Sequence, residues 1–170
     1  MRILINDTSC LIDLRKAGLL PVTLGLPYRF VVALPLVDTE LLDFSETDWE
    51  TLKGLGLEVL DLDSEKIGQA LRFKATNPRL TANDCFSLVL AAAHQKAILL
   101  TGDQALRQVA EGLKVEVHGV LWVIDALDRH GVDPHTLLDG LRRWKDDRLV
   151  FLPTAELDRR IGVLRRRLGH

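Results

Sequence analysis

Four acidic residues stand out because each lies where an apolar segment of the chain ends or a helix-like segment begins: Asp7, Glu40, Asp84 and Asp103. Asp7 and Asp103 follow strand-like runs directly, whereas Glu40 and Asp84 are expected in the first turns of helices. In an α/β protein such positions lie at one edge of the sheet, outside the carboxyl ends of the strands, where ligands bind. Because four carboxylates brought together repel one another unless a cation lies among them, the pattern indicates a metal site.

The ligand atoms indicate which metal this site would hold. A set of oxygen donors without His or Cys suits a hard cation, Mg²⁺ or Mn²⁺. Asp7 and Asp103 are expected to bind the ion directly, because each leaves the end of a strand. Asp84 is expected to bind directly or through a water, and Glu40 to position a water. The set is large enough for one ion with supporting partners, or for two ions bridged by a phosphate.

Each acid taken alone also has an ordinary structural explanation. Asp7 and Asp103 are placed to cap a following helix, and Asp84 would interact favourably with a helix dipole. Glu40 has acidic neighbours and is compatible with a solvated helix face. The combination carries the prediction, because four separate segments are unlikely to place acids at one edge by chance.

Other chemistries have weaker support in the sequence. No glycine-rich loop of the GxGxxG or GxxxxGK[ST] type is present, and the five histidines form no HExxH motif. Ser9 and Ser87 lack the GxSxG elbow of serine hydrolases. The three tryptophans are scattered and form no visible platform for base stacking.

The segments that must position the acids alternate between strands and helices. Since strands separated by helices need crossover connections, we expect a single-domain, three-layer α/β/α fold with a mostly parallel central sheet. The helix at 81–95 is apolar almost all round and should pack against the sheet with both sides covered. Strands are expected at 2–6, 30–34, 57–60, 97–100 and 113–117, and helices at 8–16, 35–44, 45–53, 64–74, 81–95, 104–110, 119–129, 134–144 and 154–168.

The C-terminal segment differs in charge from the rest of the chain. A break near residue 146 separates residues 1–146 from residues 147–170, which we expect to form a basic amphipathic helix packed on the domain or on a partner. Residues 141–170 contain nine Lys and Arg and four acids, a net charge of about +5. The apolar stripe of this helix should dock, while its five arginines should face the phosphates of a substrate. The stripe consists of Leu157, Ile161, Leu164 and Leu168.

Composition places the chain among ordinary globular proteins. It has 170 residues, 47% hydrophobic and 27% charged, enough for one domain with a real core. Cys10 and Cys85 form no CxxC pair, so buried free thiols are expected. We expect a cytoplasmic protein with no membrane association. Met1 is followed at once by a strand pattern without signal-peptide features, and no apolar run approaches the ~20 residues that span a bilayer.

Four segments resemble, in chain order, the four acidic motifs of PIN domains, and more narrowly the prokaryotic, VapC-like toxin branch. These segments are NDTSCLI at 6–12, PLVDTEL at 35–41, NDCFSL at 83–88 and LTGD at 100–103. VHGVLWVI at 117–124 is similar to the Gly-containing strand-to-helix segment that follows the fourth acid in prokaryotic members. The ordered set is far more specific than any one of its short motifs.

This resemblance implies a compact α/β/α nuclease domain at residues 1–146, in which four acids hold Mg²⁺ or Mn²⁺ for ribonuclease chemistry. It implies an RNA substrate and, because many small PIN proteins are toxins of toxin–antitoxin pairs, a cognate antitoxin protein. Homodimerisation is expected as well. The resemblance makes Asp7, Glu40, Asp84 and Asp103 the catalytic and metal-binding residues, with Ser9 and Thr101 as supporting polar positions.

Two alternatives to a metal-dependent ribonuclease remain open at this stage. The first is a degenerate PIN module that binds RNA or a protein partner without cutting. The second is a phosphatase of the haloacid-dehalogenase type, which also places an Asp after its first strand. Such phosphatases need a second Asp two residues later, where this chain has Ser9.

Overall fold

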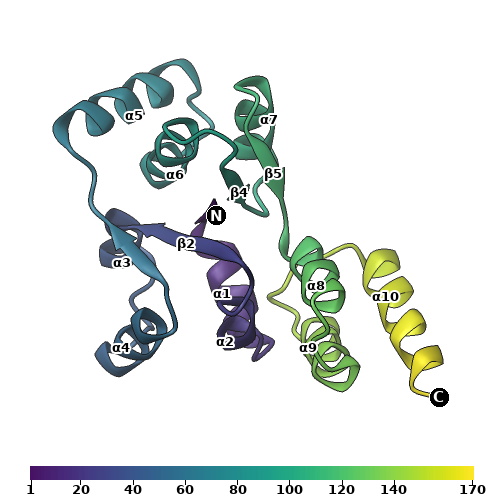
Figure 1. Cartoon of the computed structure of the whole chain (residues 1–170). Coiled ribbons are helices and arrows are strands. Elements are labelled where there is room, and N and C mark those ends of the chain that lie inside the picture. Colours follow the sequence, from purple (N-terminus) through teal and green to yellow (C-terminus); the bar gives the residue numbers. More distant parts are fainter.

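The centre of the molecule is a five-stranded, all-parallel sheet with the strand order β3-β2-β1-β4-β5 (Figure 1). The computed structural model describes all residues, 1–170. Strand β1 lies in the middle, with Leu4 paired to Phe30 of β2 and to Ile98 of β4. Because every strand runs in the same direction, all five carboxyl ends meet at one edge. The strands are β1 (Arg2–Asn6), β2 (Tyr28–Ala33), β3 (Glu58–Leu60), β4 (Ile98–Leu100) and β5 (Glu116–His118).

Helices cover both faces of this sheet, as the alternating pattern predicts. In Figure 1, α5, α6 and α7 lie on one side of the sheet, and α1, α2, α8 and α9 lie on the other, with α10 outermost. The fold is therefore a three-layer α/β/α sandwich in one domain. None of the helices has the length and apolarity needed to cross a membrane. The helices are α1 (Thr8–Lys16), α2 (Leu20–Thr23), α3 (Leu34–Thr39), α4 (Glu46–Gly54), α5 (Ser64–Thr76), α6 (Ala82–Ala92), α7 (Gln104–Gly112), α8 (Val120–Arg129), α9 (Pro134–Asp146) and α10 (Thr154–Arg167).

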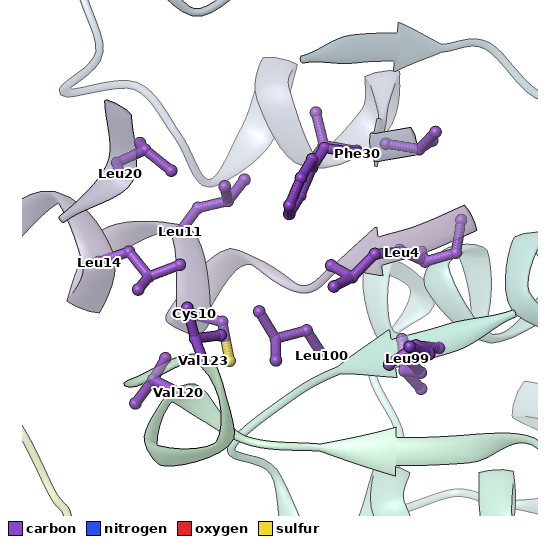
Figure 2. Close-up of a cluster of buried hydrophobic side chains, with 14 of the residues drawn as sticks. Leu4, Cys10, Leu11, Leu14, Leu20, Phe30, Leu99, Leu100, Val120 and Val123 are labelled. Atoms are coloured by element: carbon purple, nitrogen blue, oxygen red, sulfur yellow. The ribbon is translucent and has the colours of Figure 1, made fainter. Parts of the chain in front are cut away.

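A continuous hydrophobic core joins the sheet to its helices. Figure 2 shows Leu11 of α1 between Leu14 of the same helix and Phe30 of β2, and Val123 of α8 beside Cys10. Burying one such leucine stabilises the fold by about 1.5–3 kcal/mol. The cysteines take part in this packing as free, buried residues, as predicted. The core fixes the carboxyl ends of β1 and β4, from which the functional loops leave.

Helix α6 is the most buried of the helices. Its residues from Ser87 to Ala91 are all buried, because the helix packs on the sheet through one side and on α5 through another. The prediction of an apolar helix covered on both sides is confirmed. Its start is also firmly determined, since Thr81 and Asp84 form a capping box at the first turn.

Two predictions about local structure are wrong. Helix α3 starts at Leu34, with Pro35 in its first turn, but ends at Thr39 instead of continuing to about residue 44. Glu40 is therefore the residue that ends this helix and not a member of a first turn. Helix α2 was not expected, because four residues around Pro21 carry too little periodicity to predict a helix.

The C-terminal helix docks on the body of the protein through its predicted apolar stripe. Leu157, Ile161 and Leu164 are buried, and α10 packs along α9. Leu168, the last member of the stripe, is partly buried against the same core. Within this single chain the helix therefore packs on α9 of its own domain.

The arginines of α10 do not all point away from the protein, which corrects the prediction that they face substrate phosphates. Arg160 forms a bidentate pair with Asp125 of α8 at 2.9 and 2.8 Å, and Arg167 forms one with Asp128 at 2.7 Å. We call these two pairs the arginine clasp. The physical reason is that α8 presents acids one helical turn apart directly opposite the basic helix. Arg159 is also paired, with Glu156 on its own helix.

Candidate active site

A cavity of about 780 Å³ opens at the edge of the sheet where the strands end. Its walls come from the chain following β1, β4 and β5, from the start of α6, and from the connection between α9 and α10. All four predicted acids line this cavity, although they come from four separate segments of the chain. They are Asp7, Glu40, Asp84 and Asp103.

Asp7 is the most buried of the four acids and caps the first turn of α1. Its Oδ1 accepts a hydrogen bond from the backbone N–H of Thr8 at 2.9 Å, and its Oδ2 accepts one from the Thr101 hydroxyl at 2.8 Å. The pKa of Asp7 is raised from its usual 3.8 to about 6, mainly by burial and also by the charges of Asp84 and Glu40, against the lowering effect of the hydrogen bonds from Thr101 and Thr8. The negative charge of the ionised Asp7 carboxylate is therefore not offset by a cationic side chain.

Thr101 joins two of the acidic segments. While its hydroxyl donates to Asp7, the same oxygen accepts a hydrogen bond from the backbone N–H of Asp103 at 3.1 Å. Asp103 in turn caps α7, with its Oδ1 accepting from the Leu106 N–H at 2.7 Å. Thr101, directly after β4, thus binds the carboxylate of Asp7 and the backbone of Asp103, and Thr101 itself is completely buried.

Asp84 is positioned by the start of α6. Its Oδ2 accepts a hydrogen bond from the Thr81 N–H at 2.8 Å, and the Thr81 hydroxyl accepts from the Asp84 N–H at 3.1 Å. Burial raises the pKa of Asp84, the hydrogen bonds from Thr81 lower it, and the neighbouring charges of Asp103 and Glu40 raise it. The helix cap therefore fixes one oxygen and leaves the other without a hydrogen-bond partner in the protein.

Glu40 lies exposed at the mouth of the cavity, tied to α6 by Asn83. The Asn83 amide donates to a Glu40 carboxylate oxygen and, at 2.8 Å, to the Thr39 hydroxyl. These contacts join the end of α3 to the start of α6, which are 44 residues apart in sequence. Asn83 was not among the predicted site residues, although its position directly before Asp84 was a signal for it.

Two further hydroxyls lie beside Asp7. Ser9 lines the cavity and faces Gly102 across it, but it forms no hydrogen bond to any of the four carboxylates. Thr8 also lines the cavity, and its buried hydroxyl has no hydrogen-bond partner at all. Because a buried polar group without a partner is costly, the Thr8 hydroxyl is a group available to a ligand.

The carboxylates of the cavity have almost no cationic compensation. No salt bridge involves Asp7, Glu40, Asp84 or Asp103. The one basic residue in the lining is Arg107, which lies one turn after Asp103 on α7 and contacts the Val117 carbonyl and Glu111. Arg107 was missed by the sequence interpretation, although its spacing from Asp103 places both on one helix face.

The side chains as they stand are not yet close enough to share a metal ion, since no three Asp, Glu, His or Cys residues form such a group. Each carboxylate is already held by hydrogen bonds within the protein, and the four repel one another. The donor set nevertheless fits a hard divalent cation: all donors are oxygens, Asp84 and Asp103 each keep an oxygen without a protein partner, and the orphaned Thr8 hydroxyl lies alongside. Binding would require the carboxylates to move closer together.

Comparison with known proteins agrees with this architecture. The family model DUF3368, described as a PIN domain, matches residues 3–149, which include the sheet, the four acids and helices α1 to α9. No curated protein sequence matches the chain. Because the matched region spans most of the chain, this protein belongs to the PIN-domain family.

Proposed function

We propose that the protein is a divalent-metal-dependent endoribonuclease. The observation that carries the proposal is that four carboxylates from separate segments line one cavity without a cationic partner. A fold that needed these acids only for local structure would have no reason to place all four in the lining of one cavity. PIN domains are nuclease folds, so the family agrees with the proposal.

Asp7, Asp84 and Asp103 would hold Mg²⁺ or Mn²⁺, with Glu40 assisting. A bound ion would supply two effects: a lower pKa for a water molecule that attacks the phosphate, and neutralisation of the charge that develops there. Asp7 is prepared for this role by Thr8 and Thr101, which fix both of its oxygens. Since a proton and a cation compete for the same carboxylate, its raised pKa makes cation binding weaker below about pH 6.

The shape of the site favours a single-stranded substrate. The cavity is open along one side and is bounded by the loops that follow three strands. A flexible single strand can bend a phosphate towards carboxylates at the bottom of such a cavity, whereas a stiff duplex keeps its backbone further away. Single-stranded RNA is therefore the substrate class that we propose.

We extend the proposal to a toxin of a toxin–antitoxin pair, acting in the cytoplasm as a homodimer. An RNA-cutting enzyme needs restraint in its own cell, and the acidic cavity offers an inhibitor a place to bind. An Arg or Lys of an antitoxin inserted among the carboxylates would replace the charge of the metal in a desolvated position, where ion pairing is strong. Co-expression with the product of the neighbouring gene, followed by measurement of growth and complex formation, tests this extension.

The direct test is cleavage of a mixed pool of RNA with Mg²⁺ or Mn²⁺. We expect wild-type activity to disappear with EDTA, and Asp7→Asn and Asp84→Asn to be inactive while remaining folded. Asp38→Asn is the matched control, because it makes the same acid-to-amide change at an exposed position outside the cavity. Cleavage that survives chelation, or that persists in Asp7→Asn, would rule the proposal out.

A second candidate is a PIN module that binds RNA without cutting it, and the separation of the carboxylates favours it. It predicts that the wild type binds RNA but leaves it intact with Mg²⁺ and Mn²⁺ alike. Because the chain belongs to the PIN family, the phosphatase alternative is not carried further.

A further inference from the structure

Two large apolar side chains stand in solvent at the mouth of the acidic cavity. Leu149 is 73% exposed and Phe151 is 88% exposed, and both line the cavity from the connection between α9 and α10. In Figure 1 this connection passes close to α1 and α8. We call these two residues the apolar rim. Exposure of this degree is unfavourable for a phenylalanine unless a ligand covers it.

The rim is held in place by its own segment. Val150 between the two rim residues is only 9% exposed, so one side chain of this segment packs inward while its two neighbours face solvent. Asp147 fixes the start of the segment: its Oδ1 accepts a hydrogen bond from the Leu149 N–H at 2.8 Å, and its carboxylate pairs with Lys16 of α1 at 3.5 Å. The outward position of Phe151 thus follows from the turn at Asp147 together with the contact between this segment and α1.

Two aromatic residues line the cavity, Trp122 and Phe151, and Phe151 is the one whose ring has no aromatic partner within the protein. Trp122 also lines the cavity, but His118 stacks on it with ring centroids 4.4 Å apart and an interplanar angle of 7°, and Tyr28 lies 5.9 Å away. The indole of Trp122 is therefore already engaged. Neither rim residue takes part in any aromatic pair within the protein.

We infer that the apolar rim is a docking platform for a nucleobase of single-stranded RNA, with the base stacked on Phe151 and a neighbouring phosphate directed into the acidic cavity. This inference rests on the proposed function for the identity of the polymer. The acids of the cavity repel an RNA backbone, so the affinity must come from parts of the substrate that carry no charge. The face of a base is such a part, and stacking tolerates any base.

The size of the rim favours a base over a protein. The exposed parts of one Phe and one Leu amount to roughly 300 Å², whereas a stable protein interface covers about 800 Å² on each partner. The cation nearest to the carboxylates, Arg107 in the same cavity, is suited to a phosphate of the same strand. A duplex keeps its bases stacked inside, so the rim would also select single strands.

The test compares two labelled oligomers of equal length by fluorescence anisotropy in EDTA, where no cleavage is expected. One is single-stranded RNA and the other carries the same phosphates with abasic sugars. We expect the wild type to bind the RNA about tenfold more tightly than the abasic chain. Phe151→Ala should remove this preference and Phe151→Trp should keep it. Leu42→Ala is the matched control, since Leu42 is 71% exposed outside the cavity.

Three results would overturn the inference. The first is an RNA preference that Phe151→Ala leaves unchanged, and the second is the absence of any preference in the wild type. The third is a wild-type dimer in sedimentation that Phe151→Ala separates into monomers, which would assign the rim to a second copy of the chain. A base preference that depends on Phe151 in a protein that cleaves nothing would support the inference while the proposed function fails. Cleavage of RNA without any base preference would support the proposed function while the inference fails.

Discussion

The acids of the cavity and the acids of the arginine clasp have opposite environments. Burial raises the pKa of Asp7 to about 6, and no arginine or lysine pairs with it. In the clasp, hydrogen bonds from Arg167 hold the pKa of Asp128 below its usual range. The aspartates that join two helices are therefore paired with arginines, whereas the four predicted acids that line the cavity have no arginine or lysine partner.

This difference separates structural acids from candidate functional ones better than burial or sequence does. An acid that only stabilises the fold is paired, as in the clasp, and its charge contributes to stability. An acid kept without a partner makes the free protein less stable, a cost that a bound cation would remove. The following predictions test the two halves of this comparison, beginning with the largest expected effect.

The largest effect on stability is expected for Arg160→Met. Arg160 is only 12% exposed and pairs with both Asp125 and Glu156, so its loss leaves Asp125 without a partner, while Glu156 keeps its pair with Arg159. We expect the free energy of unfolding to fall by about 2 kcal/mol, between the values for exposed and for buried pairs. Urea unfolding measures this change, and Arg165→Met on the same helix, which removes no ion pair, is the control. An equal loss in both variants would show that the clasp contributes nothing specific.

An effect of comparable size and opposite sign is expected for Asp7→Asn, which should stabilise the metal-free protein at pH 7 by about 2 kcal/mol, with about 3 kcal/mol as the upper bound set by the pKa shift. The folded protein holds the proton of Asp7 up to about pH 6, whereas the unfolded chain releases it near 3.8. Wild-type stability due to this group therefore falls as the pH rises from about 4 to about 6, and then levels off.

The stability difference between Asp7→Asn and the wild type should accordingly vanish below about pH 4 and be complete above about pH 6. Thermal unfolding in EDTA across this range measures it. A variant less stable than the wild type at pH 7 would mean that the hydrogen bonds of Asp7 outweigh its uncompensated charge, against the comparison drawn above.

The smallest effect is expected for Arg167→Gln in the exposed part of the clasp. Arg167 is about half exposed, and exposed pairs contribute roughly 0.2–1 kcal/mol. We expect a loss of about 0.5 kcal/mol that disappears in 1 M NaCl, because salt screens exposed charges. The contribution should also disappear as the pH falls and Asp128 is protonated, the reverse of the trend for Asp7. A loss that persists in high salt would indicate lost packing instead.

Much of the fold follows from local patterns in the sequence. Strands β1, β2 and β4 are apolar runs buried on both faces, and the capping box at Thr81 marks the start of α6 unambiguously. Helix α3 was predicted too long because nothing in the local sequence shows where it stops. Its end is instead fixed by tertiary contacts, among them those that Asn83 makes with Thr39 and Glu40.

The site was predictable only in part, for a related reason. The acids could be placed at one edge because parallel strands bring their carboxyl ends together. Thr101 was included only through the family resemblance, and its contact with Asp7 spans 94 residues. Phe151 could not be predicted, because its exposure depends on how the connection between α9 and α10 packs on α1. The arginine clasp was not predicted, because the sequence of α10 reveals its arginines but does not reveal that the acids of α8 lie opposite them.

The central claim is that the acids of the cavity form a binding site for a divalent cation. The most direct test is to compare the melting temperature of the protein with and without Mg²⁺ or Mn²⁺. We predict a rise for the wild type that corresponds to about 2.7 kcal/mol at a hundredfold excess over Kd. Asp7→Asn and Asp84→Asn should show little or no rise, while Asp38→Asn should respond like the wild type. Equal melting temperatures with and without millimolar Mg²⁺ and Mn²⁺, or an undiminished rise in Asp84→Asn, would contradict the account.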